Sequence, residues 1–420
     1  MLLLKNGTFV HWQTLEFLQK DILIMEGKDG KIVLDPTPQE AGGAKVIDCT
    51  GDFITKSFAC GHHHVYSALA RGMGAPRKNP DNFNEILQYI WWALDKSLNT
   101  DMIRYSALAT AMACAKNGVT FAIDHHASPF AVKGSLETIA EAFDEVGIGH
   151  LLCYEISDRD GMDIARQGFE ESESFLMKNQ GLVGLHASFT VGNDTLNQAV
   201  KLAGQMESGI HVHVAEATSD QDHCLATYGK RVIERFAEAG VLQFPKTILG
   251  HCLHLSDHER GLVAGSPAWV VQNMESNLNN SVGFFNSKGL GYRIMIGTDG
   301  MHSDMLRSAK SSFFAGHNFD TIDYTETYRR FRNVHNYLYD NNFQGDGENN
   351  LVILEYDTPT PLTSTNFLGH FLFGIESRHV KHVISKGKLI VEDGEIITVN
   401  ERKILEEAGK QALTLWERMK

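Results

Sequence analysis

The sequence predicts an α/β fold, a (β/α)₈ TIM barrel with a small β-sandwich domain built from both termini. Three observations lead to this prediction. Between about residues 53 and 320, eight apolar strand-like runs alternate with helical segments. Short strand-like runs with tight turns occupy both ends of the chain, and strands that each lead into a helix or long loop favour a closed parallel barrel. Glycine stands just after five of the helical segments, where a helix C-cap favours it: Gly118, Gly147, Gly181, Gly209 and Gly240.

Residues 1–52 are expected to form the N-terminal part of the β-sandwich. Their short apolar runs are separated by turn-forming residues, and Asp29-Gly30 between two of these runs is a hairpin signal. The expected strands are Leu2–Leu4, Asp21–Met25, Lys31–Leu34 and Lys45–Asp48.

Residues 53–345 are expected to form the barrel. Its eight strands are apolar runs, expected at Ile54–His64, Val119–His125, Gly149–Ile156, Gly181–Ala187, Gly209–Ala215, Lys246–Cys252, Ala268–Gln272 and Tyr292–Thr298. The helices between them are expected at Met102–Asn117, Ser135–Val146, Gly161–Asn179, Thr195–Ser208, Gln221–Ala239, Ser256–Val263 and Asp304–Gly316. The segment 321–350 has an ambiguous pattern, and its Arg329-Arg330-Phe331-Arg332 run is interpreted as a solvated helix face.

Residues 346–420 return to strand texture and then end in a helix. The two terminal sets of strands are therefore expected to pack together as one small domain beside the barrel. The expected elements are strands at Leu351–Leu354, His382–Ser385, Lys388–Val391 and Ile396–Val399 and a closing helix over Glu401–Met419.

The composition limits the possible classes of function. The chain of 420 residues has a formal net charge of −14, which argues against a nucleic-acid binder and against adhesion to anionic membranes. It has no apolar run long enough for a transmembrane helix and no signal-peptide core at its N-terminus. Its six cysteines are scattered without a Cys-x-x-Cys pair, which is typical of reduced thiols. These features predict a cytoplasmic protein with no nucleic-acid or membrane partner.

The expected barrel strands end in polar residues that bind metals. Side chains at i and i+2 of a strand point to the same face, so His62 and His64 can reach one ion while His63 faces away. A single strand-end histidine is more often a core residue than a ligand. Here, however, imidazole and carboxylate groups stand at nearly every strand end. Burying them together would cost free energy unless a metal ion or water satisfied their polar atoms. The polar residues at these strand ends are Asp124, His125 and His126, Glu155, Asp158 and Arg159, His186, His211, His213 and Glu216, His251, and Asp299.

Imidazole and carboxylate ligands with an open position are typical of a catalytic site for zinc or a similar divalent ion. Such an ion lowers the pKa of its bound water and supplies hydroxide. Glu216, three residues after His213, is placed to accept the water proton, and His251 to bond the same water or to shuttle a proton. Asp299 is the natural anionic ligand.

At these residues the sequence resembles the amidohydrolase superfamily, and within it the triazine-hydrolase and guanine-deaminase-like aminohydrolases. The similarity is greatest to the SsnA-type aminohydrolases, and it spans the whole barrel and continues into the tail. The segments that carry it include Gly61-His62-His63-His64, Ala70-Arg71-Gly72-Met73, His213-Val-Ala-Glu216, Gly250-His251-Cys252, Glu275-Ser-Asn277 and Gly297-Thr298-Asp299-Gly300.

The resemblance implies a ligand set and roles for further residues. It implies His62, His64, His213 and Asp299 as metal ligands, Glu216 as general acid/base and His251 as the residue oriented on the metal water. The fourth strand offers His186 and no lysine, so one metal ion is expected: zinc first, with iron or manganese as alternatives. His186, Arg159, Gln272 and His126 are the expected substrate contacts.

Two alternative interpretations remain for some of these residues. Arg159 can bind the substrate or belong to a salt-bridged loop. Trp91-Trp92, with Phe83 and Tyr89, can form a lid over a planar substrate or pack at the barrel rim or a subunit contact. The chain also departs from the family pattern at Lys56-Ser57, at Gln272-Asn273-Met274 and at Asn349-Asn350.

These features together predict a metal-dependent hydrolase that deaminates an amino-substituted planar heterocycle related to purines, pterins or pyrimidines. In a first alternative the same site hydrolyses a different bond, namely a cyclic amide, formimino or carbon–halogen bond. A second is a catalytically inactive barrel used for binding or assembly. The expected partners are the small heterocyclic substrate and a second copy of the chain in a homodimer.

Overall fold

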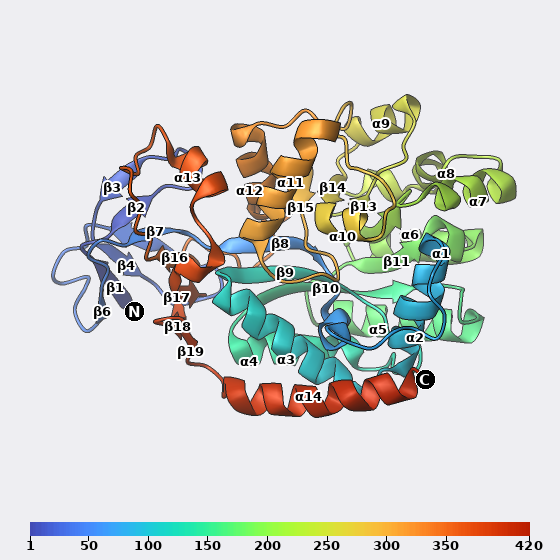
Figure 1. Ribbon diagram of the computed structural model, residues 1–420, viewed down its shortest axis with the longest axis horizontal. Coiled ribbons are helices and arrows are strands. Elements are labelled where there is room, and N and C mark those ends of the chain that lie inside the picture. Colours follow the sequence, from blue (N-terminus) through green and yellow to red (C-terminus); the bar gives the residue numbers. More distant parts are fainter.

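The computed structural model describes all 420 residues, and its centre is a barrel of eight parallel strands surrounded by helices (Figure 1). Each strand pairs in parallel with the next along the chain. This confirms the expected TIM barrel. The strands are β8 (Phe58–His63), β9 (Val119–His126), β10 (Gly149–Ile156), β11 (Val183–Ala187), β12 (Ile210–Val214), β13 (Ile248–His251), β14 (Trp269–Gln272) and β15 (Ile294–Ile296).

The barrel closes where the end of β15 meets β8. The backbone N–H groups of Thr298 and Asp299 donate to the carbonyl of His62 over 3.0 and 3.1 Å. Glycine is required at this seam, because a Cβ on Gly297 would lie 2.8 Å from that of His62 and one on Gly61 would lie 2.9 Å from the Ile296 carbonyl oxygen. The close approach brings Asp299 beside the first pair of histidines.

The helices cover the outside of the barrel because each has one apolar face. In α4, for example, Leu136, Ile139, Ala140 and Phe143 repeat at helical spacing and are buried, and the helix ends at Gly147 in a left-handed conformation with φ 101°. The longer helices are α3 (Thr100–Lys116), α4 (Ser135–Val146), α5 (Met162–Leu176), α6 (Asn193–Gln205), α7 (Thr218–Tyr228), α8 (Val232–Ala239), α9 (Asp257–Ala264), α11 (Met305–Phe319), α12 (Tyr324–Asp340) and α14 (Glu401–Arg418). None combines the length and the apolar character needed to cross a membrane.

Shorter helical segments lie in the loops of the barrel and in the tail. Residues Val65–Ala70 form a 3₁₀ segment, η1, directly after β8, and Leu87–Trp91 form a π-helical segment, η2. The others are α1 (Phe83–Ile86), α2 (Trp92–Ser97), η3 (Ser188–Thr190), η4 (Val241–Gln243), α10 (Met274–Asn279), α13 (Phe367–Phe373) and η5 (Ser377–His379).

Two sheets built from both termini form the expected β-sandwich. One sheet has the strand order β5-β4-β1-β6 and the other β19-β18-β17-β16-β7-β2-β3. Their facing sides share a core in which Leu4 and Ile24 of the first sheet join Ile54, Ile353 and Ile384 of the second. The strands are β1 (Leu2–Lys5), β2 (Thr8–Val10), β3 (Phe17–Gln19), β4 (Ile22–Ile24), β5 (Ile32–Leu34), β6 (Lys45–Asp48), β7 (Phe53–Lys56), β16 (Leu351–Leu354), β17 (Val380–Ser385), β18 (Lys388–Glu392) and β19 (Glu395–Ile396).

The expected strand over residues 54–64 is divided at Ser57. Its first half is β7, which pairs with β16 in the sandwich, and its second half is β8 in the barrel. Ser57 turns between them, its N–H donating to the Asn350 carbonyl over 3.0 Å and its hydroxyl lying 2.6 Å from that of Thr120. The two halves are both apolar, so the pattern alone does not reveal the break.

The interpretation of the arginine run as a solvated face is wrong for two of its members. Arg330 and Arg332, on α12, are buried. Arg330 is paired with Asp320 and Glu326 at 2.6 and 2.7 Å. Arg332 donates to the carbonyls of Lys56 and Ser57, and so fixes α12 to the β7–β8 junction.

A buried charge cluster holds the same junction. Lys56 Nζ lies 2.8 Å from Asp346 Oδ1, and His335 Nδ1 lies 2.6 Å from Asp346 Oδ2. Burial alone would raise the pKa of Asp346, but His335 and Lys56 outweigh it and lower the pKa to about 2. Asp346 therefore remains ionised at every pH at which the protein is expected to work.

We expect Asp346→Asn to destabilise the protein by about 3 kcal/mol at pH 7, because removing one partner leaves a buried charge uncompensated. The pKa of Asp346 is lower in the folded chain than in the unfolded chain. Its contribution is therefore present above about pH 4 and is lost as the pH falls through about 2. Chemical denaturation of both proteins over pH 2–7 measures this. A difference between them that does not shrink on acidification would contradict the assignment.

Candidate active site

The expected ligands meet at the C-terminal end of the barrel. His62 and His64 come from the end of β8, His213 from β12, and Asp299 from the turn after β15. His64 Nε2 lies 3.2 Å from Asp299 Oδ1 and 3.2 Å from His213 Nε2. His62 Nε2 lies 3.8 Å from the same carboxylate oxygen. Three imidazoles and one carboxylate thus direct their ligand atoms at one point.

The far side of each imidazole is held by the protein. The Nδ1 atoms of His64 and His213 lie 2.7 and 3.1 Å from the carbonyl oxygens of His125 and His186, to which they donate. When these rings are neutral, the donation leaves the lone pair on Nε2, the state that ligates metals. His62 Nδ1 lies 2.9 Å from His211 Nε2, whereas its buried Nε2 has no hydrogen-bond partner.

This arrangement fits a divalent cation. Two unprotonated Nε2 atoms at 3.2 Å repel each other unless a positive charge lies beside them. Burial would lower the pKa of His64, but the hydrogen bond and the charge of Asp299 outweigh it and raise the pKa to about 9. The cluster thus attracts positive charge, and an ion would also satisfy the free Nε2 of His62.

The backbone is strained at the strand ends that present these groups. Ala215, His251, Cys252 and Asp299 have φ values of 46°, 66°, 55° and 53°, a left-handed region that such residues seldom adopt. Strain of this kind persists where the surrounding structure enforces it, and it concentrates at functional sites. Here it turns the chain so that Glu216, His251 and Asp299 face one another.

Glu216 lies beside the ligand cluster as a carboxyl group. Its Oε2 is 3.5 Å from His251 Nε2. Burial, and next the negative charge of Asp299, raise the pKa of Glu216 well above its usual range. A carboxyl group with a raised pKa can both accept and return a proton near neutral pH.

His251 is oriented by a residue to which the sequence assigned no role. Asn277 Nδ2 lies 2.8 Å from His251 Nδ1, so the ring accepts there and carries its proton on Nε2. Burial lowers the pKa of His251 to about 4, which keeps the ring neutral. That Nε2–H faces Glu216 and Asp299, whose Oδ2 is 3.7 Å away. The only sequence signal for Asn277 was its place in a family-like segment.

A cavity of about 50 Å³ opens above the ligand cluster. His186 and Arg159, two expected substrate contacts, line it. Arg159 is ion-paired with Asp95, with Glu155 at 3.4 Å and with Asp160 at 3.0 Å, so the salt-bridge interpretation also describes it. Aromatic residues complete the wall: Tyr66, Phe83, Trp91 and Trp92.

Two other expected substrate contacts lie away from this cavity. Gln272 Oε1 accepts a hydrogen bond from Arg330 over 3.0 Å, and His126 Nε2 lies 2.9 Å from the hydroxyl of Ser128. Both side chains are fully buried against these partners, so neither reaches a ligand in the cavity. The reason is the direction of each side chain at the strand end, which the strand-end position alone does not reveal.

The aromatic residues before α3 were expected either to form a lid over the substrate or to pack at the barrel rim, and each interpretation describes some of them. Phe83, Trp91 and Trp92 line the cavity, as a lid would, whereas Tyr89 stacks under the ammonium group of Lys78 outside it. His63 faces away from the ligand cluster, with its Nε2 3.0 Å from the Ser303 hydroxyl.

Comparison with known proteins gives a consistent result. The model of a family described as the amidohydrolase family matches residues 53–390. A 5-methylthioadenosine/S-adenosylhomocysteine deaminase of Syntrophomonas wolfei is 24% identical over 430 residues, covering 95% of each chain. A 5'-deoxyadenosine deaminase of Methanopyrus kandleri is 27% identical over 344 residues, covering 76% of this chain and 78% of the relative.

Solved structures show the same fold. An adenosine deaminase of Xanthomonas campestris with bound zinc superposes with a TM-score of 0.83 at 18% identity, over 99% of this chain and 98% of that chain. An atrazine chlorohydrolase of Arthrobacter aurescens, also with zinc, superposes with a TM-score of 0.82 at 14% identity, over 98% and 100%. The resemblance seen in the sequence is confirmed by the family model, which spans most of the chain. The chain belongs to the amidohydrolase family.

Proposed function

We propose that the protein is a hydrolase that removes an amino group from a planar heterocycle as ammonia. The observation that carries the proposal is the position of Glu216, a carboxyl group of raised pKa beside His251 and the ligand cluster. One divalent ion, zinc first, is proposed at His62, His64, His213 and Asp299. When bound, such an ion lowers the pKa of a coordinated water toward neutrality.

The side chains around the ligand cluster have different roles in the reaction. Glu216 accepts a proton from the attacking water and passes it to a ring nitrogen of the heterocycle, which makes the amino-bearing carbon more electrophilic. Glu216 then carries the second proton of the water from the new hydroxyl group to the amino group. The C–N bond breaks, ammonia leaves, and a carbonyl group remains on the ring. The Nε2–H of His251 donates toward the same region and stabilises negative charge on the attacking oxygen. His186 and the aromatic walls hold the ring, and their enclosure limits access of bulk water.

The test is ammonia release from amino-substituted purines, pterins, pyrimidines and triazines by the metal-loaded protein. Adenine derivatives are tested first, because the two relatives described above are deaminases of adenosine-type compounds. Mass spectrometry of the product separates the alternatives, since exchange of NH₂ for OH adds about one mass unit and ring opening adds about eighteen. Release of halide or of a ring-opened product without ammonia would overturn the proposal in favour of another bond.

Asn277→Leu is expected to lower kcat by about tenfold with little change in KM. The substitution removes the hydrogen bond that keeps the proton of His251 on Nε2, and fixing a tautomer acts on the chemical step more than on binding. Steady-state kinetics with an identified substrate measure this. A change confined to KM would contradict the positioning role of Asn277.

We also propose that the protein is a homodimer that works in the cytoplasm. All six cysteines are buried and unpaired, which suits a reducing compartment.

The dimer contact is proposed at an exposed aromatic cluster. Phe314, Tyr324 and Phe373 form this cluster and are 53%, 42% and 58% exposed, an arrangement typical of a contact surface. We expect sedimentation of a dimer for the wild type and of a monomer for Phe314→Glu/Phe373→Glu; a dimeric double variant would place the contact elsewhere.

A further inference from the structure

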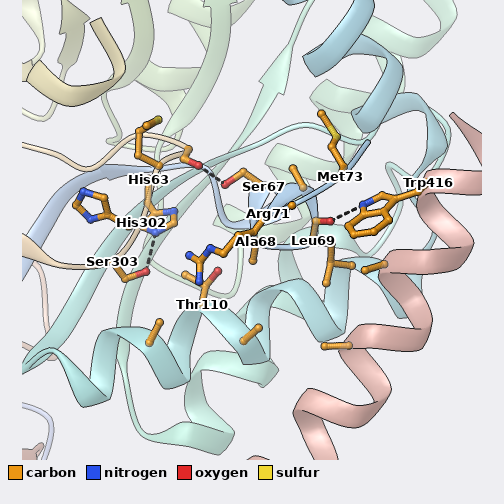
Figure 2. A pocket seen from close by; sticks show the side chains of 18 of the residues that line it. His63, Ser67, Ala68, Leu69, Arg71, Met73, Thr110, His302, Ser303 and Trp416 are labelled. Carbon is orange, nitrogen blue, oxygen red and sulfur yellow. Dashed lines mark hydrogen bonds between the residues drawn. The ribbon is translucent and has the colours of Figure 1, made fainter. Parts of the chain in front are cut away.

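A groove of about 1050 Å³ lies next to the catalytic cavity and has no role in the mechanism above. Its walls come from η1, α3 and α14 and from residues 300–303 (Figure 2). The Trp416 indole on α14 donates to the Leu69 carbonyl over 2.8 Å, which fixes the C-terminal helix to η1 across the groove. The groove is therefore a built feature of the fold rather than a gap between loose elements.

The groove and the catalytic cavity share part of their walls. Trp91, Asn280, Gly300 and Met301 line both. The loops that carry the ligand residues continue directly into the groove, since η1 follows His64 and residues 300–303 follow Asp299. Within the groove the hydroxyl of Ser67 donates to the carbonyl oxygens of both loops, 2.7 Å to that of His64 and 2.9 Å to that of Gly300.

The sizes of the two spaces indicate how they are used. Pockets that bind small molecules commonly measure about 300–1,000 Å³. The catalytic cavity, at about 50 Å³, falls far below this range, whereas the adjoining groove offers about 1050 Å³. A substrate whose reacting ring lies over the ligand cluster therefore has a large adjoining space for a substituent on the side of the groove.

One cation in the groove has no counter-charge. The ammonium of Lys116 is paired with Glu401 at 2.8 Å, and the imidazole of His302 with Glu275. Arg71, in contrast, is exposed and takes part in no hydrogen bond or ion pair (Figure 2). An unpaired guanidinium in a chain of net charge −14 is a ready partner for a carboxylate or phosphate.

The remainder of the groove is largely apolar. Met73 and Ile90 line it, and Leu405, Leu413 and Trp416 line it from α14. These side chains fit a chain of methylene groups. The groove thus combines an apolar passage with a single free positive charge.

We infer that the groove binds a substituent of the heterocyclic substrate, an apolar stem that ends in an anionic group held by Arg71. The inference rests on the proposed function, because it places the reacting ring of the same substrate over the ligand cluster. The substrate class is thereby narrowed to heterocycles with an anionic side chain. Bare bases are expected to be poorer substrates than their carboxyalkyl derivatives.

The test uses binding, so that it does not depend on which heterocycle is deaminated. The probes are 5-phenylpentanoate and its neutral analogue 5-phenylpentan-1-ol, titrated by calorimetry into the metal-loaded full-length protein. We expect the carboxylate to bind at least tenfold more tightly than the alcohol, and Arg71→Gln to abolish this difference. Arg77→Gln is the matched control: it removes an exposed arginine that lies outside the groove, and it should retain the difference.

The outcomes separate this inference from the proposed function. Glu216→Gln should abolish ammonia release yet retain tight binding of the carboxylate, so a failed deamination screen leaves the binding test valid. Equal affinity for carboxylate and alcohol, no binding of either, or tight carboxylate binding that survives in Arg71→Gln would overturn the inference. The last of these would place the carboxylate on the metal.

A second copy of the chain is the competing occupant of the groove. Leu413 is 62% exposed on α14 and tests this alternative. If the groove is free for substrate, Leu413→Asp should weaken carboxylate binding by charge repulsion without changing the sedimentation coefficient. A dimeric wild type that becomes monomeric through Leu413→Asp would assign the groove to subunit contact and overturn the inference.

Discussion

Glu216→Gln is expected to lower turnover of a deaminated heterocycle by about a thousandfold while the protein keeps its metal. Proton transfer by a positioned side chain contributes about 10²–10⁴-fold to a rate, and an amide cannot accept and return the proton. The change retains the shape of the side chain, and Glu216 is placed beside the ligand cluster and not in it. Initial rates of ammonia release, together with metal analysis of the same samples, measure the effect.

The control for this variant is Glu141→Gln, which makes the same chemical change on the exposed face of α4. It should turn over like the wild type. Turnover by Glu216→Gln within threefold of the wild type would remove Glu216 from its role as general acid/base. Loss of metal from Glu216→Gln would instead show that its carboxylate belongs to the ligand set.

Removal of the metal is expected to abolish activity and to lower the melting temperature. Without an ion, the buried Nε2 of His62 has no partner and the Nε2 atoms of His64 and His213 face each other at 3.2 Å. An ion that binds only the folded chain stabilises it by about 2.7 kcal/mol at a free concentration of one hundred times Kd. Thermal scans before chelation, after chelation and after addition of zinc measure this.

The neighbouring histidines His62 and His63 provide a matched pair for the same site. His62→Asn should lose stoichiometric metal, whereas His63→Asn should retain it, because the His63 ring faces Ser303 and the groove. Full activity and an unchanged melting temperature after complete chelation would contradict the metal site. Retention of metal by His62→Asn would remove His62 from the ligand set.

Most of the barrel and the positions of the ligands could be predicted from the sequence. The carboxyl ends of parallel barrel strands meet on one face, so polar residues at those ends must gather there. The alternation of side chains along a strand then separates His63 from His62 and His64. These arguments need only the local pattern and the side-chain types, and both are written in the chain.

The pattern did not distinguish between polar residues at equivalent strand ends. Gln272 and His186 both stand near a strand end, yet Gln272 bonds to Arg330 outside the cavity and His186 lines it. The buried Arg330 is in turn paired with Asp320, ten residues earlier in the chain. Arg332 contacts carbonyls some 275 residues away. Partners of this kind are set by packing and not by neighbours in the sequence.

The sequence by itself determined the alternation of strands and helices, the sandwich built from both termini, and the set of residues able to bind a metal and transfer a proton. Only the tertiary structure decided which of them face one point, how Asn277 orients His251, and that α14 and η1 enclose a groove beside the site. The physical reason is the separation along the chain over which each kind of interaction acts. Periodicity and side-chain chemistry act over a few residues, whereas the direction of a strand-end side chain and the shape of a cavity depend on contacts between segments far apart in the chain.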